Sequence, residues 1–233
     1  MEKRKHDNFD QFAKDYNEVH AKTLDMSGAD RDYFSEYKIA EVAKHESSSA
    51  RYNMLDFGCG DGNSVRYMRE YFPKAVLFGT DVSELSIEQA SAKQISNSTF
   101  KQYDGETLPF EDGFFDVVFT SMVFHHISFD HHKNILKEIH RVLKPNGRFY
   151  IFEHNPLNPV TRKIVRECEF DHDAVLLPHR YTRELLTEGG FVDQQTRFTL
   201  FLPRHWVFRW ALFSERLIAW LPLGAQYYVR SLK

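Results

Sequence analysis

A glycine-rich turn between two apolar segments constrains the fold of this chain more than any other feature. The turn, residues 58–62, has the spacing G-x-G-x-G, and it follows the apolar segment 52–57. A helix-compatible segment comes next, and a second apolar segment over residues 75–80 ends in Asp81. A strand, a glycine turn, a helix and a second strand in this order predict a βαβ unit, which holds a nucleotide-like ligand at the carboxyl ends of its strands.

The rest of the chain continues this alternation of apolar strands and amphipathic helices. We expect further strands over residues 99–103, 114–123 and 147–153. Strands that alternate with helices predict a doubly wound, parallel sheet with right-handed crossovers. A β-rich pair over residues 191–201 and 226–232 closes the sheet. The prediction is a Rossmann-like α/β fold of seven strands, mostly parallel with an antiparallel C-terminal strand, and with helices on both faces.

The first part of the chain differs in character from the remainder. Residues 1–45 are polar with scattered aromatic side chains, and they contain two helical patterns, the second of which covers residues 33–44. This composition predicts an N-terminal helical arm, which either packs on the sheet or forms a lid over a site. Residues 46–233 then form the main domain, including an aromatic C-terminal helix and the closing strand.

The composition limits the classes of function that the chain can have. Its 233 residues, of which 42% are hydrophobic, are enough for one α/β domain with its own core. The formal net charge of −3 gives no electrostatic reason to expect a nucleic acid as partner. Cys59 and Cys168 have no metal-type spacing, and the polar N-terminus does not resemble a secretion signal. The two cysteines favour a reducing, cytoplasmic setting, and because no apolar run is long enough to span a membrane, we expect no transmembrane segment.

Three carboxylates stand near the ends of three predicted strands. Asp56 lies just before the glycine turn, Asp81 ends the second strand, and Asp104 follows the third. Several carboxylates would repel a diphosphate, so they favour a ligand with little phosphate, a ribose and a positive group. The dinucleotide fingerprint also requires G-x-G-x-x-G, and Asn63 stands where its last glycine would be. Both observations argue against a dinucleotide and favour a nucleoside that carries an amino group and a sulfonium.

A set of motifs in this order resembles the class I S-adenosylmethionine-dependent methyltransferases of the type-11 group. The motifs are LDFGCGDG at 55–62, GTDVS at 79–83, DGETLPF at 104–110, FDVV at 115–118, HH at 125–126 and EIHRVLKPNG at 138–147. They cover about residues 50–155 and are specific as a set. The segment 153–159 and the tail 222–230 are also similar to a bacterial subgroup that is often associated with surface-polysaccharide or secondary-metabolite pathways.

The resemblance implies S-adenosylmethionine as the cofactor and assigns a position to each matching residue. Those near the methionine part are Asp56, Gly58, Cys59, Gly60, Thr120 and Ser121, and those near the nucleoside are Asp81 at the ribose and Val82, Asp104 and Gly105 at the adenine. Methyl transfer is a displacement at a sulfonium carbon, so it depends mainly on alignment and on the exclusion of water.

Histidines near the carboxyl ends of the fourth and fifth strands are the candidates for a general base. His125 and His126 follow the fourth strand, and His125 is favoured because neighbouring side chains point in different directions. His154 follows the fifth strand, in a segment that either binds the acceptor or starts a helix rigidly. The alternative for all three is a role in shaping the pocket. His131 and His132 begin a helix and lack a zinc motif, so no metal site is expected.

The aromatic segment near the C-terminus permits two interpretations. Large apolar residues share one helical stripe between residues 204 and 223, at Trp206, Trp210, Phe213, Leu217 and Trp220. Such a stripe is ordinarily packed on the sheet or on a second subunit, which is the interpretation we favour. Because three arginines lie nearby, contact with a membrane surface or with a lipid-linked acceptor is the alternative.

These observations predict a methyltransferase that acts on a small-molecule or carrier-linked acceptor. The acceptor is expected to be a sugar, a metabolite or a lipid-linked intermediate, with O-methylation favoured over N- or C-methylation. Two alternatives remain: a protein that binds S-adenosylmethionine without catalysis, and an NAD-dependent oxidoreductase. The sequence does not determine the oligomeric state.

Overall fold

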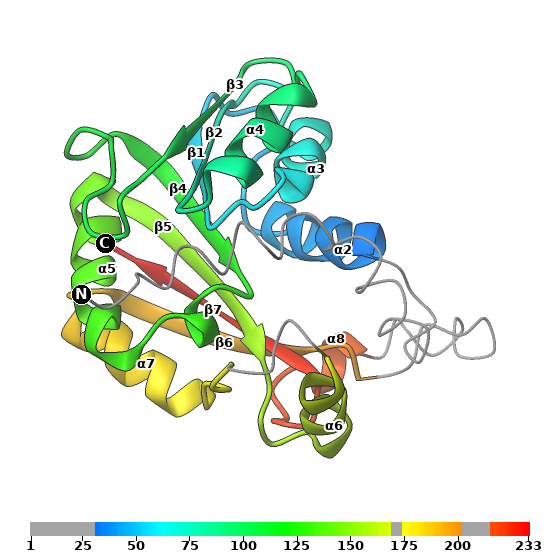
Figure 1. Ribbon diagram of the computed structural model, residues 1–233. Coiled ribbons are helices and arrows are strands. Elements are labelled where there is room, and N and C mark those ends of the chain that lie inside the picture. The colour runs from blue at the N-terminus through cyan, green and yellow to red at the C-terminus, as the bar shows by residue number, and fades with distance from the viewer. Residues whose placement is uncertain (1–30, 169–173, 202–214) are drawn as a thin grey trace.

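The computed structural model describes residues 31–168, 174–201 and 215–233 (Figure 1). Its helices and strands succeed one another in the predicted order. They are α2 (Arg31–Ala43), β1 (Asn53–Phe57), α3 (Asn63–Tyr71), β2 (Val76–Asp81), α4 (Glu84–Ala92), β3 (Ser98–Gln102), β4 (Phe115–Ser121), the 3₁₀ turn η2 (Phe124–His126), α5 (Phe129–Val142), β5 (Leu143–His154), α6 (Pro159–Glu167), α7 (His179–Glu188), β6 (Val192–Thr199), α8 (Glu215–Ile218) and β7 (Gln226–Leu232).

One sheet of seven strands organises the molecule, in the order β3-β2-β1-β4-β5-β7-β6. Strands β1 to β5 pair in parallel, whereas β7 pairs antiparallel with both β5 and β6. The predicted fold is therefore confirmed, including the antiparallel C-terminal strand. The strand order reverses between β1 and β4, and in open α/β sheets ligands bind outside the carboxyl ends of the strands at such a point.

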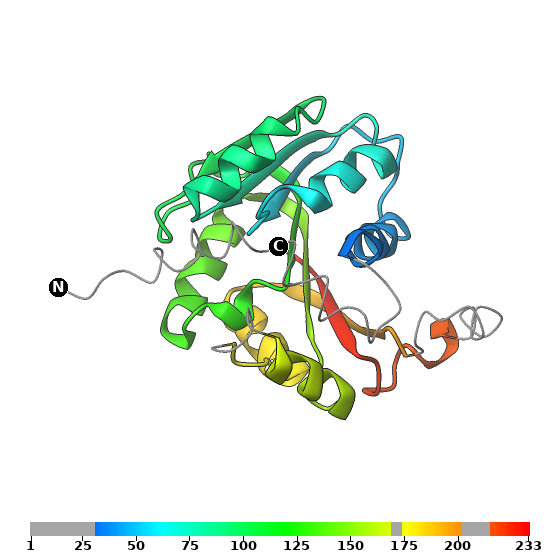
Figure 2. The same ribbon diagram turned by 45° about the vertical axis from the view of Figure 1, so that its right-hand side comes forward.

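Both faces of the sheet are covered by helices, as the uninterrupted apolar runs of its central strands require. On one face α2 and α3 bury Ile39, Val42 and Met68 in a core with Phe119 and Phe152. On the other face, α5 and α7 contribute their apolar stripes to a separate core. Figures 1 and 2 show α2 beside α3 and away from α5 and α7.

Helix α2 lies where the second helical pattern of the arm predicts it. Ile39 and Val42 are fully buried against the sheet. Just after the helix, the buried carboxylate of Glu46 accepts hydrogen bonds from the Arg148 guanidinium and, at 2.7 Å, from the Tyr150 hydroxyl. These contacts anchor the C-terminal end of α2 to β5. The first helical pattern of the arm lies outside the described residues.

The aromatic segment is described only in its last part. Trp206, Trp210 and Phe213 lie outside the described residues, and the segment continues as the short helix α8. Leu217 and Trp220 are 73% and 68% exposed, and the Trp220 indole donates to the Leu217 carbonyl at 3.1 Å. In the described parts of the chain, no helix is long and apolar enough to cross a membrane.

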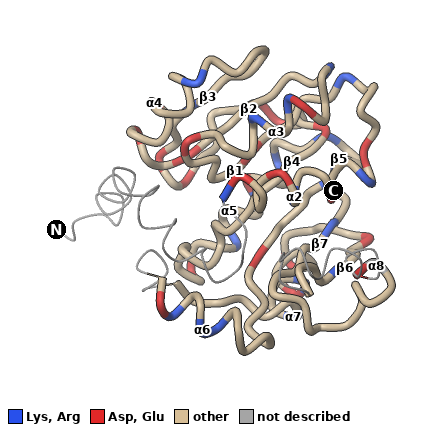
Figure 3. Tube along the Cα trace, turned by 90° about the vertical axis from the view of Figure 1, so that its right-hand side faces the viewer, with Lys and Arg blue, Asp and Glu red and all other residues tan. Residues whose placement is uncertain are grey.

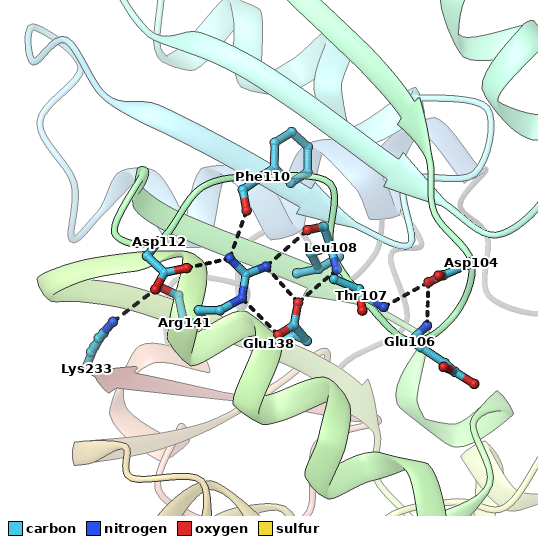
Figure 4. A network of polar contacts seen from close by, with 9 residues as sticks. All are labelled: Asp104, Glu106, Thr107, Leu108, Phe110, Asp112, Glu138, Arg141 and Lys233. Carbon is cyan, nitrogen blue, oxygen red and sulfur yellow. Dashed lines mark hydrogen bonds and ion pairs between the residues drawn. The ribbon is translucent and has the colours of Figure 1, made fainter.

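The loop between β3 and β4 is held on α5 by one arginine (Figure 4). The Arg141 guanidinium donates to the backbone carbonyls of Leu108 and Phe110 at 3.1 and 2.9 Å, and to the carboxylates of Asp112 and Glu138, both at 2.7 Å. Glu138 in turn accepts from the Leu108 amide at 2.9 Å. This network fixes the loop that comes after the carboxyl end of β3.

Replacing Arg141 with alanine is expected to lower the free energy of unfolding by about 2–3 kcal/mol, because charge-assisted bonds to the loop are lost. Urea denaturation followed by circular dichroism measures this change. Lys133→Ala, at an exposed position of α5 that forms an ion pair with Glu188 of α7, is the control and is expected to have no measurable effect. Equal effects of the two substitutions would contradict the assigned role of the network.

Candidate active site

The glycine turn between β1 and α3 lies at the reversal of strand order. Gly58, Gly60 and Gly62 have φ values of +73°, +51° and +76°, which residues with a Cβ rarely adopt. A Cβ on Gly58 would lie 2.3 Å from a methyl carbon of Val123, so this position also needs glycine for space. The amides of Gly58 and of the next residue both donate to the Thr80 carbonyl, at 2.8 and 3.0 Å. The turn is therefore tied to the end of β2.

Asp81 orders the backbone on both sides of the site. One carboxylate oxygen accepts from the Gly60 amide at 2.9 Å, and the other accepts from the Ser83 amide at 3.0 Å. A carboxylate has about four acceptor positions, so these bonds are compatible with further bonds to ribose hydroxyls. The ribose contact stays a prediction.

Asp56 lies at the same edge of the sheet, one residue before the end of β1. Strand register aligns the next residue, Phe57, with Thr80 and Thr120. Asp56 is 2% exposed, and its Oδ2 atom has no hydrogen-bond partner among the described residues. Burial, reinforced by the charge of Asp81, raises the pKa of the Asp56 carboxyl to about 8. A buried carboxylate oxygen without a donor fits the ammonium group of a ligand that enters at this point.

A lysine that was not among the sequence candidates reaches the same region. Lys38 of α2 is 7% exposed, and its ammonium donates to the Ser121 hydroxyl at 2.7 Å. Burial lowers the Lys38 pKa to about 8, although the charges of Glu153 and Asp56 act in the opposite direction. A lysine on a polar helix is ordinarily solvated, so the sequence carried no signal for this role.

The predicted base His125 contacts the buried carboxylate of Glu153. The His125 Nδ1 atom lies 2.5 Å from Glu153 Oε2, and both side chains are 1% exposed. The Phe124 amide donates to the other oxygen of Glu153 at 3.0 Å. Burial by itself would raise the Glu153 pKa, but the neighbouring histidines, His125 above all, hold the pKa below its usual value. The carboxylate is therefore ionised and oriented by two contacts.

His126 and His154 flank this pair. Their rings lie 4.2 and 5.5 Å, centroid to centroid, from the ring of His125, and both residues are half-buried. The structure thus brings the three predicted histidines together at the carboxyl ends of β4 and β5. After them, Asn155 donates to the carbonyls of Pro222 and Gly224, at 3.1 and 2.8 Å, which ties this part of the segment to the chain just before β7.

His131 and His132, the other histidines near this site, are possible metal ligands by residue type. The Nε2 atom of His132 lies 3.0 Å from the carbonyl oxygens of Phe124 and Ile127, so this ring holds the turn after β4. Within residues 31–168, 174–201 and 215–233, no group of histidine, cysteine and acidic side chains could hold a metal ion.

The remaining predicted cofactor residues occupy the ends of several strands. Cys59 is a buried free thiol, and burial raises its pKa. Val82 is half-buried at the end of β2. Asp104 is exposed, and its Oδ1 accepts from the two amides at positions 106 and 107, at 2.9 and 2.8 Å, while Gly105 has a φ of +84°. Thr120 is fully buried, and its hydroxyl has no partner within the described part of the chain.

Comparison with known proteins agrees with this arrangement. Residues 55–151 match the family model of a methyltransferase domain. The uncharacterized methyltransferase YcgJ of Bacillus subtilis is 31% identical over 129 residues, which are 53% of this chain and 49% of that protein. Malonyl-(acyl-carrier protein) O-methyltransferase of Herminiimonas arsenicoxydans is 37% identical over 95 residues, which are 41% of this chain and 34% of that protein. The chain therefore spans about half the length of the first relative and about a third of the second.

A solved structure extends the likeness of the fold to nearly the whole chain. Phosphoethanolamine N-methyltransferase 2 of Haemonchus contortus, in complex with S-adenosyl-L-methionine, superimposes with a TM-score of 0.67 at 17% identity. The superposition covers 97% of this chain and 60% of that one. Because the family model matches the segment that carries the glycine turn and the ends of β2 and β4, residues 55–151 form a class I methyltransferase domain of the type-11 group, whose cofactor is S-adenosylmethionine.

Proposed function

We propose that this protein transfers a methyl group to an oxygen atom of a small-molecule or carrier-linked acceptor, with His125 as the general base. One observation carries the proposal: the buried contact of 2.5 Å between His125 Nδ1 and Glu153 Oε2. The pair lies at the carboxyl ends of β4 and β5, next to the point where the strand order reverses. Open α/β sheets bind their ligands at this edge.

The geometry suits the removal of a proton from a hydroxyl group. When Nδ1 donates to Glu153, Nε2 is the nitrogen that accepts a proton, a tautomer assigned from the hydrogen-bond network. The ionised Glu153 then stabilises the imidazolium that forms, as a carboxylate does in a catalytic triad. The bound cofactor supplies a methyl group on a sulfonium. The acceptor oxygen gives its proton to His125 as it forms a bond to the methyl carbon, whose bond to sulfur breaks and leaves a neutral thioether.

The choice of acceptor has two supports. One curated relative is named as an O-methyltransferase of a malonyl group on an acyl-carrier protein, which supports oxygen and a carrier. The half-buried rings of His126 and His154 beside His125 offer hydrogen-bonding groups to a polar acceptor.

Transfer of labelled methyl from S-adenosylmethionine to a panel of hydroxyl, carboxyl and amine acceptors tests the proposal. The wild type is expected to label hydroxyl acceptors, and His125→Asn is expected to reduce turnover by about 10²–10⁴-fold. Cofactor affinity should not change. The wild-type rate should rise with pH as the imidazole loses its proton, and the variant should lack this dependence.

The exposed His131 on α5 provides a matched control, and His131→Asn should behave as the wild type. Full activity of His125→Asn with an unchanged pH profile would remove His125 as the base, and label on nitrogen or carbon would contradict O-methylation. Calorimetry distinguishes the alternatives: binding of NAD in place of S-adenosylhomocysteine would indicate an oxidoreductase. Tight S-adenosylhomocysteine binding without transfer to any acceptor would indicate a non-catalytic binding protein.

A further inference from the structure

Helix α2 carries a buried ammonium group to the methionine end of the cofactor site. We propose that Lys38 binds the carboxylate of the cofactor's methionine part, while Asp56 accepts hydrogen bonds from its ammonium. Helix α2 is then a component of the cofactor site. The proposal rests on the cofactor assigned above, but it does not depend on the identity of the acceptor or of the base.

The position of Lys38 is the first argument. Its ammonium donates to the hydroxyl of Ser121, the last residue of β4, at 2.7 Å. Strand β4 pairs with β1, which places Ser121 and Asp56 at the same edge of the sheet. Asp56 and Glu153 are the two carboxylates whose charges act on Lys38. The ammonium therefore lies beside the end of β1, where the glycine turn begins.

The balance of charge is the second argument. Glu153 already contacts His125 and the Phe124 amide, whereas the Oδ2 atom of Asp56 has no hydrogen-bond partner in the described ranges. Lys38 and Asp56 are both buried, and a buried charge is costly unless it is paired and hydrogen-bonded. A ligand with one ammonium and one carboxylate supplies a donor to Asp56 and an acceptor to Lys38 without adding net charge. An amino-acid zwitterion has this chemistry.

The rigid attachment of α2 is the third argument. Arg31 and Lys93 both donate to the carboxylate of Asp61 in the glycine turn, at 3.0 and 2.7 Å for its Oδ2 atom. The Asn63 amide nitrogen donates to Asp32 and Ser35 in the first turn of α2, both at 3.0 Å. Figure 3 shows acidic and basic residues side by side where α2 meets the end of β1 and α3.

These contacts join the start of α2 to the glycine turn, and Glu46 joins the end of α2 to β5. Lys38 lies between the two attachments, so little conformational freedom of α2 is lost when the ligand binds. The contacts also explain Asn63 at the position of the missing glycine: its side chain bonds α2 to α3.

Calorimetry with truncated ligands tests the proposal. Lys38→Met keeps most of the apolar stem and removes the charge. The ligands are S-adenosylhomocysteine, which has the ammonium and the carboxylate, decarboxylated S-adenosylmethionine, which has only the ammonium, and 5′-methylthioadenosine, which has neither. The substitution is expected to weaken S-adenosylhomocysteine binding by about 30-fold, the effect of one charge-assisted contact. It should leave the affinities for the two ligands without a carboxylate within about twofold.

Two further variants keep the result interpretable. Lys38→Arg retains the charge and is expected to recover most of the affinity for S-adenosylhomocysteine. The matched control is Lys44→Met. Lys44 is exposed, lies just after α2 and contacts Glu41, and the variant should bind all three ligands as the wild type does.

The proposal has two contrary outcomes. Equal losses for all three ligands would show that Lys38 only supports the fold, and no loss for any of them would show that it does not contact the cofactor. Wild-type protein that fails to bind S-adenosylhomocysteine would overturn the cofactor assignment itself, a result distinct from failure of the Lys38 variant alone.

Discussion

Asp56→Asn is expected to weaken S-adenosylhomocysteine binding by about 100-fold while the ligand-free protein becomes more stable. The carboxyl group is buried, and its Oδ2 atom lacks a hydrogen-bond partner within the described residues, so the ligand-free protein bears the cost of keeping this polar group away from water. Asparagine has the same shape and no charge, but it cannot form a charged pair with the cofactor ammonium. Calorimetry and thermal unfolding of the ligand-free protein measure the two effects.

The sign of the pH dependence is set by the Asp56 pKa, which burial raises from 3.8 to about 8 in the folded protein. Between these pH values Asp56 keeps its proton in the folded state and has lost it in the unfolded state. The free energy of unfolding therefore falls as the pH rises from about 4 to about 8. The stability gained by Asp56→Asn should therefore be larger at pH 7.5 than at pH 4.5. Asp193→Asn, at an exposed carboxylate, is the control and should show no such difference. Lower stability of Asp56→Asn at pH 7.5 would contradict this account.

Glu153→Gln is expected to reduce turnover by about 10²–10³-fold with little change in cofactor affinity. Glutamine preserves the volume of the side chain and can still accept from the Phe124 amide. It cannot stabilise a positive imidazolium, so His125 becomes a weaker base. Single-turnover rates with saturating S-adenosylmethionine and a hydroxyl acceptor measure the effect separately from binding.

Glu188→Gln removes an exposed carboxylate that pairs with Lys133, and it should retain wild-type turnover. Retained turnover in Glu153→Gln together with an inactive His125→Asn would show that His125 works without this carboxylate. Loss of cofactor affinity in Glu153→Gln would instead place the glutamate in the binding site. The first prediction concerns the cofactor and the second concerns the proton, so the two substitutions probe separate parts of the same edge of the sheet.

The parts of the fold that sequence could predict are those encoded by local pattern. The glycines at 58, 60 and 62 require positive φ, and all three have it. The apolar run after residue 113 predicts a central strand, and β4 lies between β1 and β5. Predicted boundaries differ most at β5, which begins at Leu143 and not at Gly147, because Leu143 pairs with Phe115 ahead of a shift in register. Pairing of this kind depends on the partner strand and is not visible in the segment itself.

The sequence by itself determined the βαβ unit, the succession of strands along the chain, the glycine turn and the histidines near the carboxyl ends of β4 and β5. Each of these depends on residues close together in the chain, and steric limits on the backbone and the periodicity of side chains act over that range. Only the tertiary structure decided the partners of the site: Lys38 reaches Ser121 across 83 positions, and His125 reaches Glu153 across 28. Such contacts exist because the sheet brings strand ends together and α2 packs over one of its faces. A lysine or a glutamate becomes part of a buried site only where packing removes it from water, and that depends on the whole fold.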